Sequence, residues 1–170
     1  MKSKKNIVLI GMMGSGKSSI GKILSNKLNL EFVDIDEKIE QKENKTITEI
    51  FKNNGENYFR KIEEDLSINY IKLQNKIISL GGGGYINLRI RKQCLANCLS
   101  VWLNWNHKTL INRIKNSKKR PLAVKLNSSE IIKLIIERSK IYNLSDYKIN
   151  CDKLNKDQIV QKIINFYDNK

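Results

Sequence analysis

The sequence predicts an α/β protein in which a five-stranded parallel sheet is flanked by helices on both faces. Short apolar, β-branched runs alternate along the chain with longer patterns of helical period. The first run leads directly into a glycine-rich loop, and the 170 residues contain no linker, repeat or low-complexity segment. We therefore expect a single domain over residues 1–170.

The expected strands and helices alternate in order along the chain. An apolar run typical of a buried parallel strand lies at 6–10, and further strands are expected at 31–34, 77–80, 99–103 and, from a weaker pattern, 147–150. The first helix is predicted by Ile20, Ile23, Leu24 and Leu28, which recur three or four residues apart. Further helical patterns cover residues 35–42, 47–73, 88–94, 108–115, 129–142 and 156–167.

The loop after the first strand has the pattern of a phosphate-binding loop. Residues 11–18 match G-x-x-x-x-G-K-[ST] between a strand and a helix, which is the context that the motif requires. In such a loop the backbone N–H groups and the positive end of the helix hold phosphate oxygens. Lys17 would reach the β and γ phosphates and act in catalysis, and Ser18 would supply a hydroxyl to Mg²⁺. The sequence therefore predicts a P-loop NTPase whose nucleotide site contains Gly14, Ser15, Gly16, Lys17 and Ser18.

Two carboxylates close the second expected strand. Asp34 and Asp36 lie two residues apart, so on an extended backbone both side chains face the same side. In a parallel α/β sheet this end of the strand borders the ligand site. One carboxylate would hold the water shell of a metal ion while the other meets a substrate hydroxyl. Either residue is equally typical of a helix N-cap.

Arginine is scarce, with six residues among 32 basic ones, so each position is informative. Arg60 lies on a helix with glutamates at helical spacing, which is typical of a surface ion pair, but its planar fork also suits bidentate capture of a carboxylate. Arg120 precedes the only proline, inside a polar interval at 115–128. This interval is expected to be either a lid that closes on phosphates or a solvated loop. Arg138 is ambiguous by itself.

Composition limits the remaining functions. The formal charge of +15 favours anionic partners, but the lysines are spread without a dense block, which indicates solvated faces rather than a nucleic-acid surface. Cys94, Cys98, Cys151 and the single histidine, His107, form neither a disulfide framework nor a zinc set. The apolar stretches are too short for a membrane span or a signal peptide. We expect a cytoplasmic monomer with no nucleic-acid or membrane partner.

Taken in order and spacing, the motifs of this chain resemble those of the shikimate kinase family. They are the loop at 11–18, Asp34-x-Asp36, Phe59-Arg60-x-x-Glu63, Ser79-Leu80-Gly81-Gly82-Gly83, Arg120-Pro121-Leu122 and Arg138-x-x-x-Tyr142. The resemblance covers residues 6 to about 152. It implies a nucleoside monophosphate kinase-like fold that uses ATP and Mg²⁺ to phosphorylate shikimate on the route to chorismate.

The resemblance also implies roles for individual residues. Asp36 would be catalytic and contact the shikimate hydroxyls, within a substrate-binding region at about 35–73. Arg60 and Arg138 would hold the shikimate carboxylate. The backbone of Gly81, Gly82 and Gly83 would line the same pocket, and Gly84 lengthens this loop beyond the family pattern. Asp34 and Ser79 would order the Mg²⁺ shell beside Ser18, Ser19 would join the nucleotide site where the family often has Thr, and Arg120 would be a catalytic lid residue over ATP. Asn155 or Lys156 would contact adenine.

Three other functions share part of this pattern. A gluconate kinase has the same loop and lid, but the combination of Asp34-x-Asp36, Arg60 and three glycines favours shikimate. A regulatory GTPase needs Asn-Lys-x-Asp, and residues 155–158 have the wrong spacing. A nucleic-acid-dependent ATPase fits the net charge, and it would show a steep salt dependence of nucleic-acid binding.

Overall fold

The computed structural model describes residues 5–116 and 126–170. Its strands form one sheet in the order β2-β3-β1-β4-β5, and every pairing is parallel. The strands are β1 (Asn6–Ile10), β2 (Glu31–Asp34), β3 (Lys76–Ser79), β4 (Cys98–Asn104) and β5 (Tyr147–Asn150). The predicted fold class is therefore confirmed, with shifts of one residue at the ends of β3 and β4.

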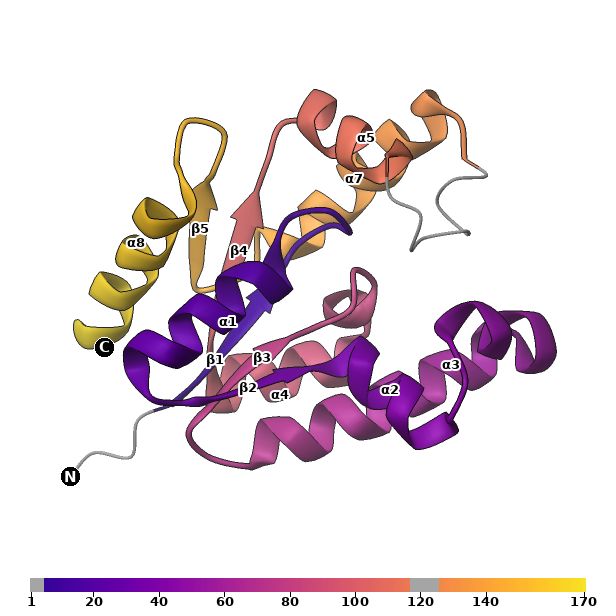
Figure 1. Ribbon diagram of the computed structural model, residues 1–170, viewed down its shortest axis with the longest axis horizontal. Coiled ribbons are helices and arrows are strands. Elements are labelled where there is room, and N and C mark those ends of the chain that lie inside the picture. The colour runs from indigo at the N-terminus through magenta and orange to yellow at the C-terminus, as the bar shows by residue number, and fades with distance from the viewer. Residues whose placement is uncertain (1–4, 117–125) are drawn as a thin grey trace.

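Helices cover both faces of the sheet (Figure 1). They are α1 (Lys17–Leu28), α2 (Ile35–Glu43), α3 (Ile47–Lys72), α4 (Leu88–Asn97), α5 (His107–Lys115), α7 (Ser128–Tyr142) and α8 (Lys156–Asp168), with a short 3₁₀ helix, η1 (Gly84–Ile86). Capping boxes begin three of them, because Thr46, Asn127 and Asn155 each exchange hydrogen bonds with the residue three positions on. These caps explain why α3, α7 and α8 begin close to their predicted starts.

The α3 segment differs from the continuous helix that the sequence predicts over 47–73. Gly55 has φ 81° and ψ 171°, so the helix is bent at this position. A residue without a Cβ reaches this backbone conformation at little steric cost, which is why the kink falls at the glycine. The bend separates the first two turns from the part of α3 that carries Arg60 and Glu63.

The core has two layers because alternate residues of each strand face opposite sides. In β1, Ile7 and Leu9 pack with α1 and α8, whereas Val8 and Ile10 pack with α2, α3, α4, α5 and α7. All five residues of β1 are buried, as a central parallel strand requires. Since every strand is parallel, the loops after β1, β2 and β3 meet at one edge of the sheet. None of the described helices is long and apolar enough to cross a membrane.

Candidate active site

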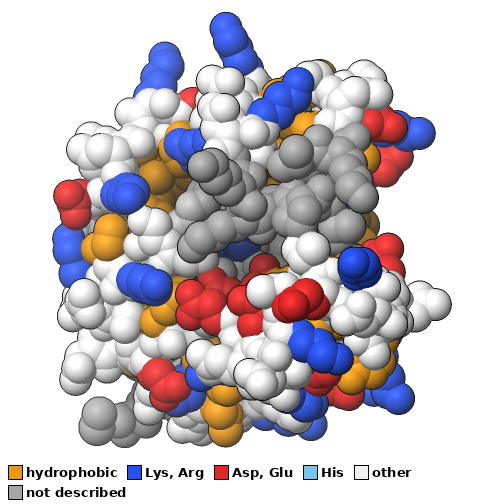
Figure 2. All heavy atoms as spheres, turned by 45° about the vertical axis from the view of Figure 1, so that its right-hand side comes forward, with side chains coloured by type: hydrophobic (Ala, Val, Ile, Leu, Met, Phe, Trp, Pro, Cys, Tyr) orange, Lys and Arg blue, Asp and Glu red, His pale blue; other side chains and the backbone are white. Residues whose placement is uncertain are grey.

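A cavity of about 320 Å³ lies at the carboxyl edge of β1, β2 and β3. Figure 2 shows a hollow near the centre of one face of the molecule, with acidic side chains gathered beside it. The cavity brings together residues that the sequence predicts for nucleotide, metal and substrate. Its lining comprises Met13, Gly14, Gly16, Lys17, Ser18, Ser19, Asp34, Asp36, Ser79, Leu80 and Gly82.

The phosphate-binding loop ends at the start of α1. Gly16 is the N-cap of this helix with φ 86°, and no side chain of the described residues caps it. The first N–H groups of α1 therefore remain available to an anion, and the helix dipole adds to the attraction. Lys17 is buried, and its Nζ donates to the carbonyls of Gly11 at 2.8 Å and Met12 at 3.0 Å. The lysine ammonium is thus held directly beside the loop.

Asp34 is the helix N-cap that one of its two interpretations predicted, and its second carboxylate oxygen contacts Ser18. Its Oδ1 accepts the N–H of Asp36 at 3.1 Å and caps α2, while its Oδ2 accepts the hydroxyl of Ser18 at 2.5 Å. Ser79 is paired in register with Asp34 on the neighbouring strand, so three oxygen-bearing side chains lie at this edge. Hard oxygen ligands of this kind fit Mg²⁺, which usually combines a few protein oxygens with phosphates and water. No group of three or more His, Cys, Asp or Glu residues that could bind a metal occurs in the described part of the chain.

A buried acid lies beside Gly81, whose two chain neighbours line the cavity. A Cβ at Gly81 would lie 2.6 Å from Oε1 of Glu63 and 2.7 Å from Oδ1 of Asp36, so both carboxylates approach the backbone of this glycine. Glu63 is only 1% exposed, and its Oε1 has no hydrogen-bond partner among the described residues. Burial raises the pKa of the Glu63 carboxyl above its ordinary value, and the charges of Arg60 and Arg138 partly offset this shift.

Arg60 forms ion pairs on its own helix and also borders the glycine loop. Its Nη1 lies 2.7 Å from Oε2 of Glu63, and its Nη2 lies 3.1 Å from Oε1 of the more exposed Glu56. Although burial opposes the guanidinium charge, these two carboxylates raise the pKa of Arg60. A Cβ at Gly83 would lie 2.6 Å from Arg60 Nη1. The ion-pair interpretation is therefore correct, but one partner, Glu63, is a buried acid rather than a surface group.

Arg138 reaches the same loop from α7. Its Nη1 donates to the carbonyl of Gly82 at 3.1 Å, and the hydroxyl of Tyr142 donates to the same oxygen. Tyr142 is fully buried, and burial raises its pKa to about 12, so the hydroxyl stays a donor at neutral pH. Because Arg60 and Arg138 both act on the Glu63 carboxyl, the structure brings the two predicted arginines to one place.

The structure does not place every predicted residue. Arg120 and most of the expected lid at 115–128 lie outside the described residues. Asn155, predicted to contact adenine, caps α8 by accepting the N–H of Gln158 at 2.9 Å, and Lys156 is the first residue of this helix. The sequence predicted Glu63 only as an ion-pair partner of Arg60, and it assigned Glu63 no place in the candidate site. Its spacing from Arg60 indicated the pair, but only the packing of α3 beneath the glycine loop shows that it is buried.

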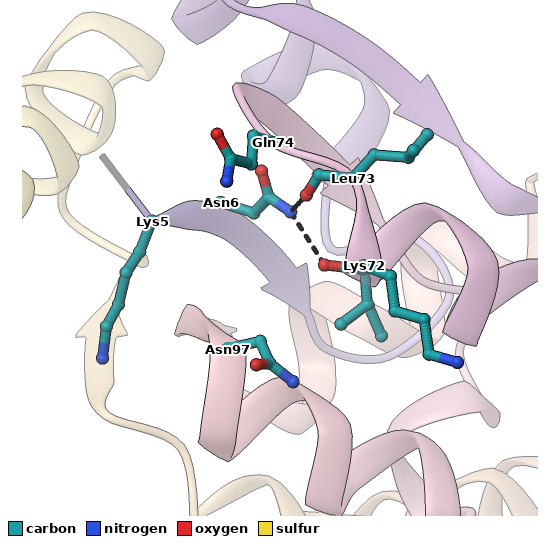
Figure 3. Close-up of a pocket in the computed structure, with 7 residues that line it drawn as sticks. Lys5, Asn6, Lys72, Leu73, Gln74 and Asn97 are labelled. Carbon is teal, nitrogen blue, oxygen red and sulfur yellow. Dashed lines mark hydrogen bonds between the residues drawn. The ribbon is translucent and has the colours of Figure 1, made fainter. Parts of the chain in front are cut away.

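A second cavity, of about 270 Å³, lies at the opposite edge of the sheet (Figure 3). Lys5, Asn6, Lys72, Leu73, Gln74 and Asn97 are among the residues that line it. The amide of Asn6 points to the end of α3, where it donates to the carbonyls of Ile71, at 3.0 Å, and Leu73. Asn6 Oδ1 also accepts the N–H of Lys76 at 2.9 Å. These hydrogen bonds join the α3–β3 turn to β1, so the polar atoms of Asn6 have a structural role.

The chemistry of the first cavity defines a class of protein. Backbone donors that suit phosphates line this cavity, and two guanidinium groups border the glycine loop beside it, on a parallel sheet covered on both faces. This arrangement is typical of a P-loop kinase that acts on a small anionic molecule. The chain belongs to the shikimate kinase family, whose sequence profile, described as "Shikimate kinase", matches residues 13–168.

Individual relatives agree with this family over nearly the whole chain. The shikimate kinase of Sulfurihydrogenibium is 42% identical over 160 residues, which cover 94% of this chain and 96% of that protein. The Bacillus subtilis shikimate kinase is 37% identical over 169 residues, with 95% and 88% of the two chains covered.

Solved structures separate the family from the wider fold. The shikimate kinase from Acinetobacter baumannii in complex with shikimate superposes with a TM-score of 0.91 at 28% identity, covering 98% of this chain and 94% of that chain. A gluconokinase from Sinorhizobium meliloti superposes with a TM-score of 0.62 at 15% identity, covering 99% and 94%. The second likeness shows a shared fold alone.

Proposed function

We propose that this protein transfers the γ-phosphoryl group of ATP to shikimate and forms shikimate 3-phosphate and ADP. Membership of the family over residues 13–168 supports the activity. The observation that carries it is the convergence of Arg60 and Arg138 on the glycine loop, which borders the same cavity as the phosphate-binding loop through Gly82. A gluconate kinase remains the alternative, but the sequence relatives at 37–42% identity are shikimate kinases.

The nucleotide is held by the loop after β1. The N–H groups of Gly14, Gly16, Lys17 and Ser18 would bind the phosphates, and Ser19 adds a hydroxyl within the cavity. Ser15 belongs to the same loop, but its own N–H donates to the carbonyl of Met12 at 3.1 Å. The ammonium of Lys17 neutralises charge that develops on the transferred group. Ser18, Asp34 and Ser79 would hold Mg²⁺ or its water shell, and the ion would supply charge neutralisation on the phosphates.

The substrate is held on the other side of the cavity. Arg60 and Arg138 receive its carboxylate through charge-assisted hydrogen bonds, and the backbone of Gly81, Gly82 and Gly83 lines the pocket. Asp36 orients the attacking hydroxyl and accepts its proton. The hydroxyl oxygen then forms a bond to the γ-phosphorus while the bond from this phosphorus to the β–γ bridging oxygen breaks. Arg120 is proposed to approach the phosphates from the segment at 115–128.

A coupled assay of ADP release tests the proposal directly. Purified protein with Mg²⁺ and ATP is supplied in parallel with shikimate, gluconate and AMP, and we expect turnover with shikimate alone. Lys17→Met should abolish this turnover while the circular dichroism spectrum and Tm stay close to wild type, because Lys17 contacts the loop rather than an apolar cluster. Turnover with gluconate but not shikimate would establish the alternative. Size-exclusion chromatography tests the expected monomer.

A further inference from the structure

Trp105 connects β4 to the back of the phosphate-binding loop. It follows the last residue of β4, and its indole Nε1 donates to the carbonyl of Ser15 at 2.9 Å. The guanidinium of Arg113, from the last turn of α5, lies 3.9 Å from the centre of the indole ring. Arg113 also donates to the carbonyl of Gly14 at 3.2 Å. Two stacked side chains therefore hold two successive carbonyls of one loop.

Peptide geometry makes these contacts relevant to the other side of the loop. In a planar trans peptide the C=O and the following N–H point in opposite directions, and none of the described peptide bonds is cis. Holding the Gly14 carbonyl directs the N–H of Ser15 away from Arg113, to where it donates to the carbonyl of Met12 at 3.1 Å inside the loop. Holding the Ser15 carbonyl directs the N–H of Gly16 away from Trp105. These N–H groups belong to the loop that lines the nucleotide cavity.

The loop needs such support because of its composition. Gly14 and Gly16 have φ angles of 83° and 86°, and glycine populates a wide range of backbone conformations. Of the two peptide planes between these glycines, the first is also held by the bond from the Ser15 N–H to the Met12 carbonyl, whereas the second would rotate readily without the contact from Trp105. Ordering them before the ligand arrives lowers the entropic cost of binding, which is the general advantage of a preorganised site.

We propose that Trp105 is a positioning residue that orients the N–H groups of the phosphate-binding loop and thereby sets the affinity for nucleotide phosphates, with Arg113 as its partner. The inference rests on the proposed function only in that this loop binds ATP. It goes beyond the motif at 11–18, which contains neither residue. Stacking on the indole fixes the guanidinium so that it can reach the Gly14 carbonyl, and cation–π contact favours this arrangement.

If Trp105 had only a structural role, its replacement would lower stability without a specific loss of phosphate affinity. The indole packs against both apolar layers of the protein, so its removal would lower stability whether or not it orients the loop. Trp105→Phe keeps an aromatic face for Arg113 and most of the apolar contact, but it loses the N–H donor. We expect binding of MgADP and MgATP, measured by calorimetry, to weaken roughly three- to tenfold, as the loss of one hydrogen bond predicts.

Inorganic tripolyphosphate distinguishes phosphate positioning from a contact with the base. Its affinity should fall by the same factor as that of ATP, whereas the KM for shikimate should stay within twofold. The matched control is Trp102→Phe, the same change at the other tryptophan, whose ring lies against Lys148 and Tyr142. This variant should keep nucleotide affinity within twofold of wild type. Unchanged tripolyphosphate affinity in Trp105→Phe, or an equal loss in Trp102→Phe, would overturn the proposal.

A fluorescence measurement tests the contact if Trp105→Phe fails to fold. In Trp102→Phe, Trp105 is the remaining tryptophan, and its emission should shift when MgADP binds because its N–H is bonded to the loop that receives the phosphates. Constant emission at saturating MgADP would contradict the proposal. Neither titration contains shikimate, so both results stand even if shikimate proves not to be the substrate.

Discussion

Replacing Gly81 by alanine tests whether the carboxylates around the glycine loop form the substrate site. The new Cβ would lie 2.6 Å from Glu63 Oε1 and 2.7 Å from Asp36 Oδ1, whereas ordinary van der Waals contact begins at 3.4 Å. The two oxygens must therefore retreat by about 0.7–0.8 Å if the loop stays in place. Both are ends of side chains, so the fold can accommodate the methyl group by moving them.

The size of the effect follows from what those side chains do. Glu63 is buried and bonded to Arg60, so displacing it also moves a guanidinium of the proposed carboxylate site. Asp36 moves away from the position where it would meet the attacking hydroxyl. A misplacement of ~1 Å in a catalytic arrangement can cost on the order of 10²-fold. We expect kcat/KM for shikimate to fall roughly 10- to 100-fold, or about 1.4–2.7 kcal/mol, with an overpacking cost of ~1–3 kcal/mol in stability.

The assay is steady-state kinetics with shikimate varied at saturating MgATP, together with calorimetric titration of MgADP. Affinity for MgADP should stay within about twofold, because the phosphate-binding loop does not contact the new methyl group. Gly84→Ala is the matched control in the same loop, since its Cβ would meet no atom closer than 3.4 Å. Wild-type kinetics in Gly81→Ala, or an equal loss in Gly84→Ala, would refute the assignment of this region as the substrate site.

Three further predictions concern Arg60, Asp36 and the three buried cysteines. Arg60→Lys should raise the KM for shikimate tenfold or more and that for ATP much less, because an ammonium lacks the fork that binds a carboxylate in a bidentate manner; equal effects on both substrates would remove the carboxylate assignment. Asp36→Asn should lower kcat by ~10²-fold, the usual contribution of a general base, and a wild-type kcat would leave Asp36 with a structural role only. Cys94, Cys98 and Cys151 are buried, and burial raises all three thiol pKa values, to about 12 for Cys98 and Cys151. They should resist a thiol reagent at pH 8 until the protein unfolds. The folded state keeps these protons, whereas the unfolded state loses them near pH 9. The free energy of unfolding should therefore fall as the pH rises from about 9 to 12. Denaturant titrations at each pH can measure this fall.

The features that were predicted most accurately are those that depend on the pattern of residues within a short stretch of sequence. The five strands, the loop at 11–18 and the helix starts follow from apolar period, glycine spacing and capping residues, all of which act over a few positions. The scarcity of arginine also singled out Arg60 and Arg138, which the structure places beside the glycine loop, and Arg120, which lies outside the described residues. Position along the chain, however, does not reveal which groups a side chain meets across the fold.

The site shows this limit in three places. Asp34 was ambiguous between cap and ligand, because the sequence does not show that one of its oxygens caps α2 while the other accepts the hydroxyl of Ser18. The burial of Glu63 depends on the glycine loop that covers it. Trp105 lies 90 positions from Ser15, and no short motif joins them. Each contact is created by the packing of elements that are distant in sequence.

The strand order explains why the phosphate-binding loop and the proposed substrate contacts lie around one edge of the sheet. Because β3 lies between β2 and β1, the glycine loop after β3 is placed between the phosphate-binding loop and the two aspartates after β2. A Cβ at Gly82 would lie 3.2 Å from the backbone N of Met13, so the two loops are in close contact. Phosphate recognition belongs to β1 and α1, whereas the proposed substrate contacts come from α2, α3, α7 and the glycine loop. The second set can therefore change with the substrate while the first is kept, which is how one fold serves kinases for different small molecules. The role that we propose for the arginines of α3 and α7 is to make that second set selective for a carboxylate.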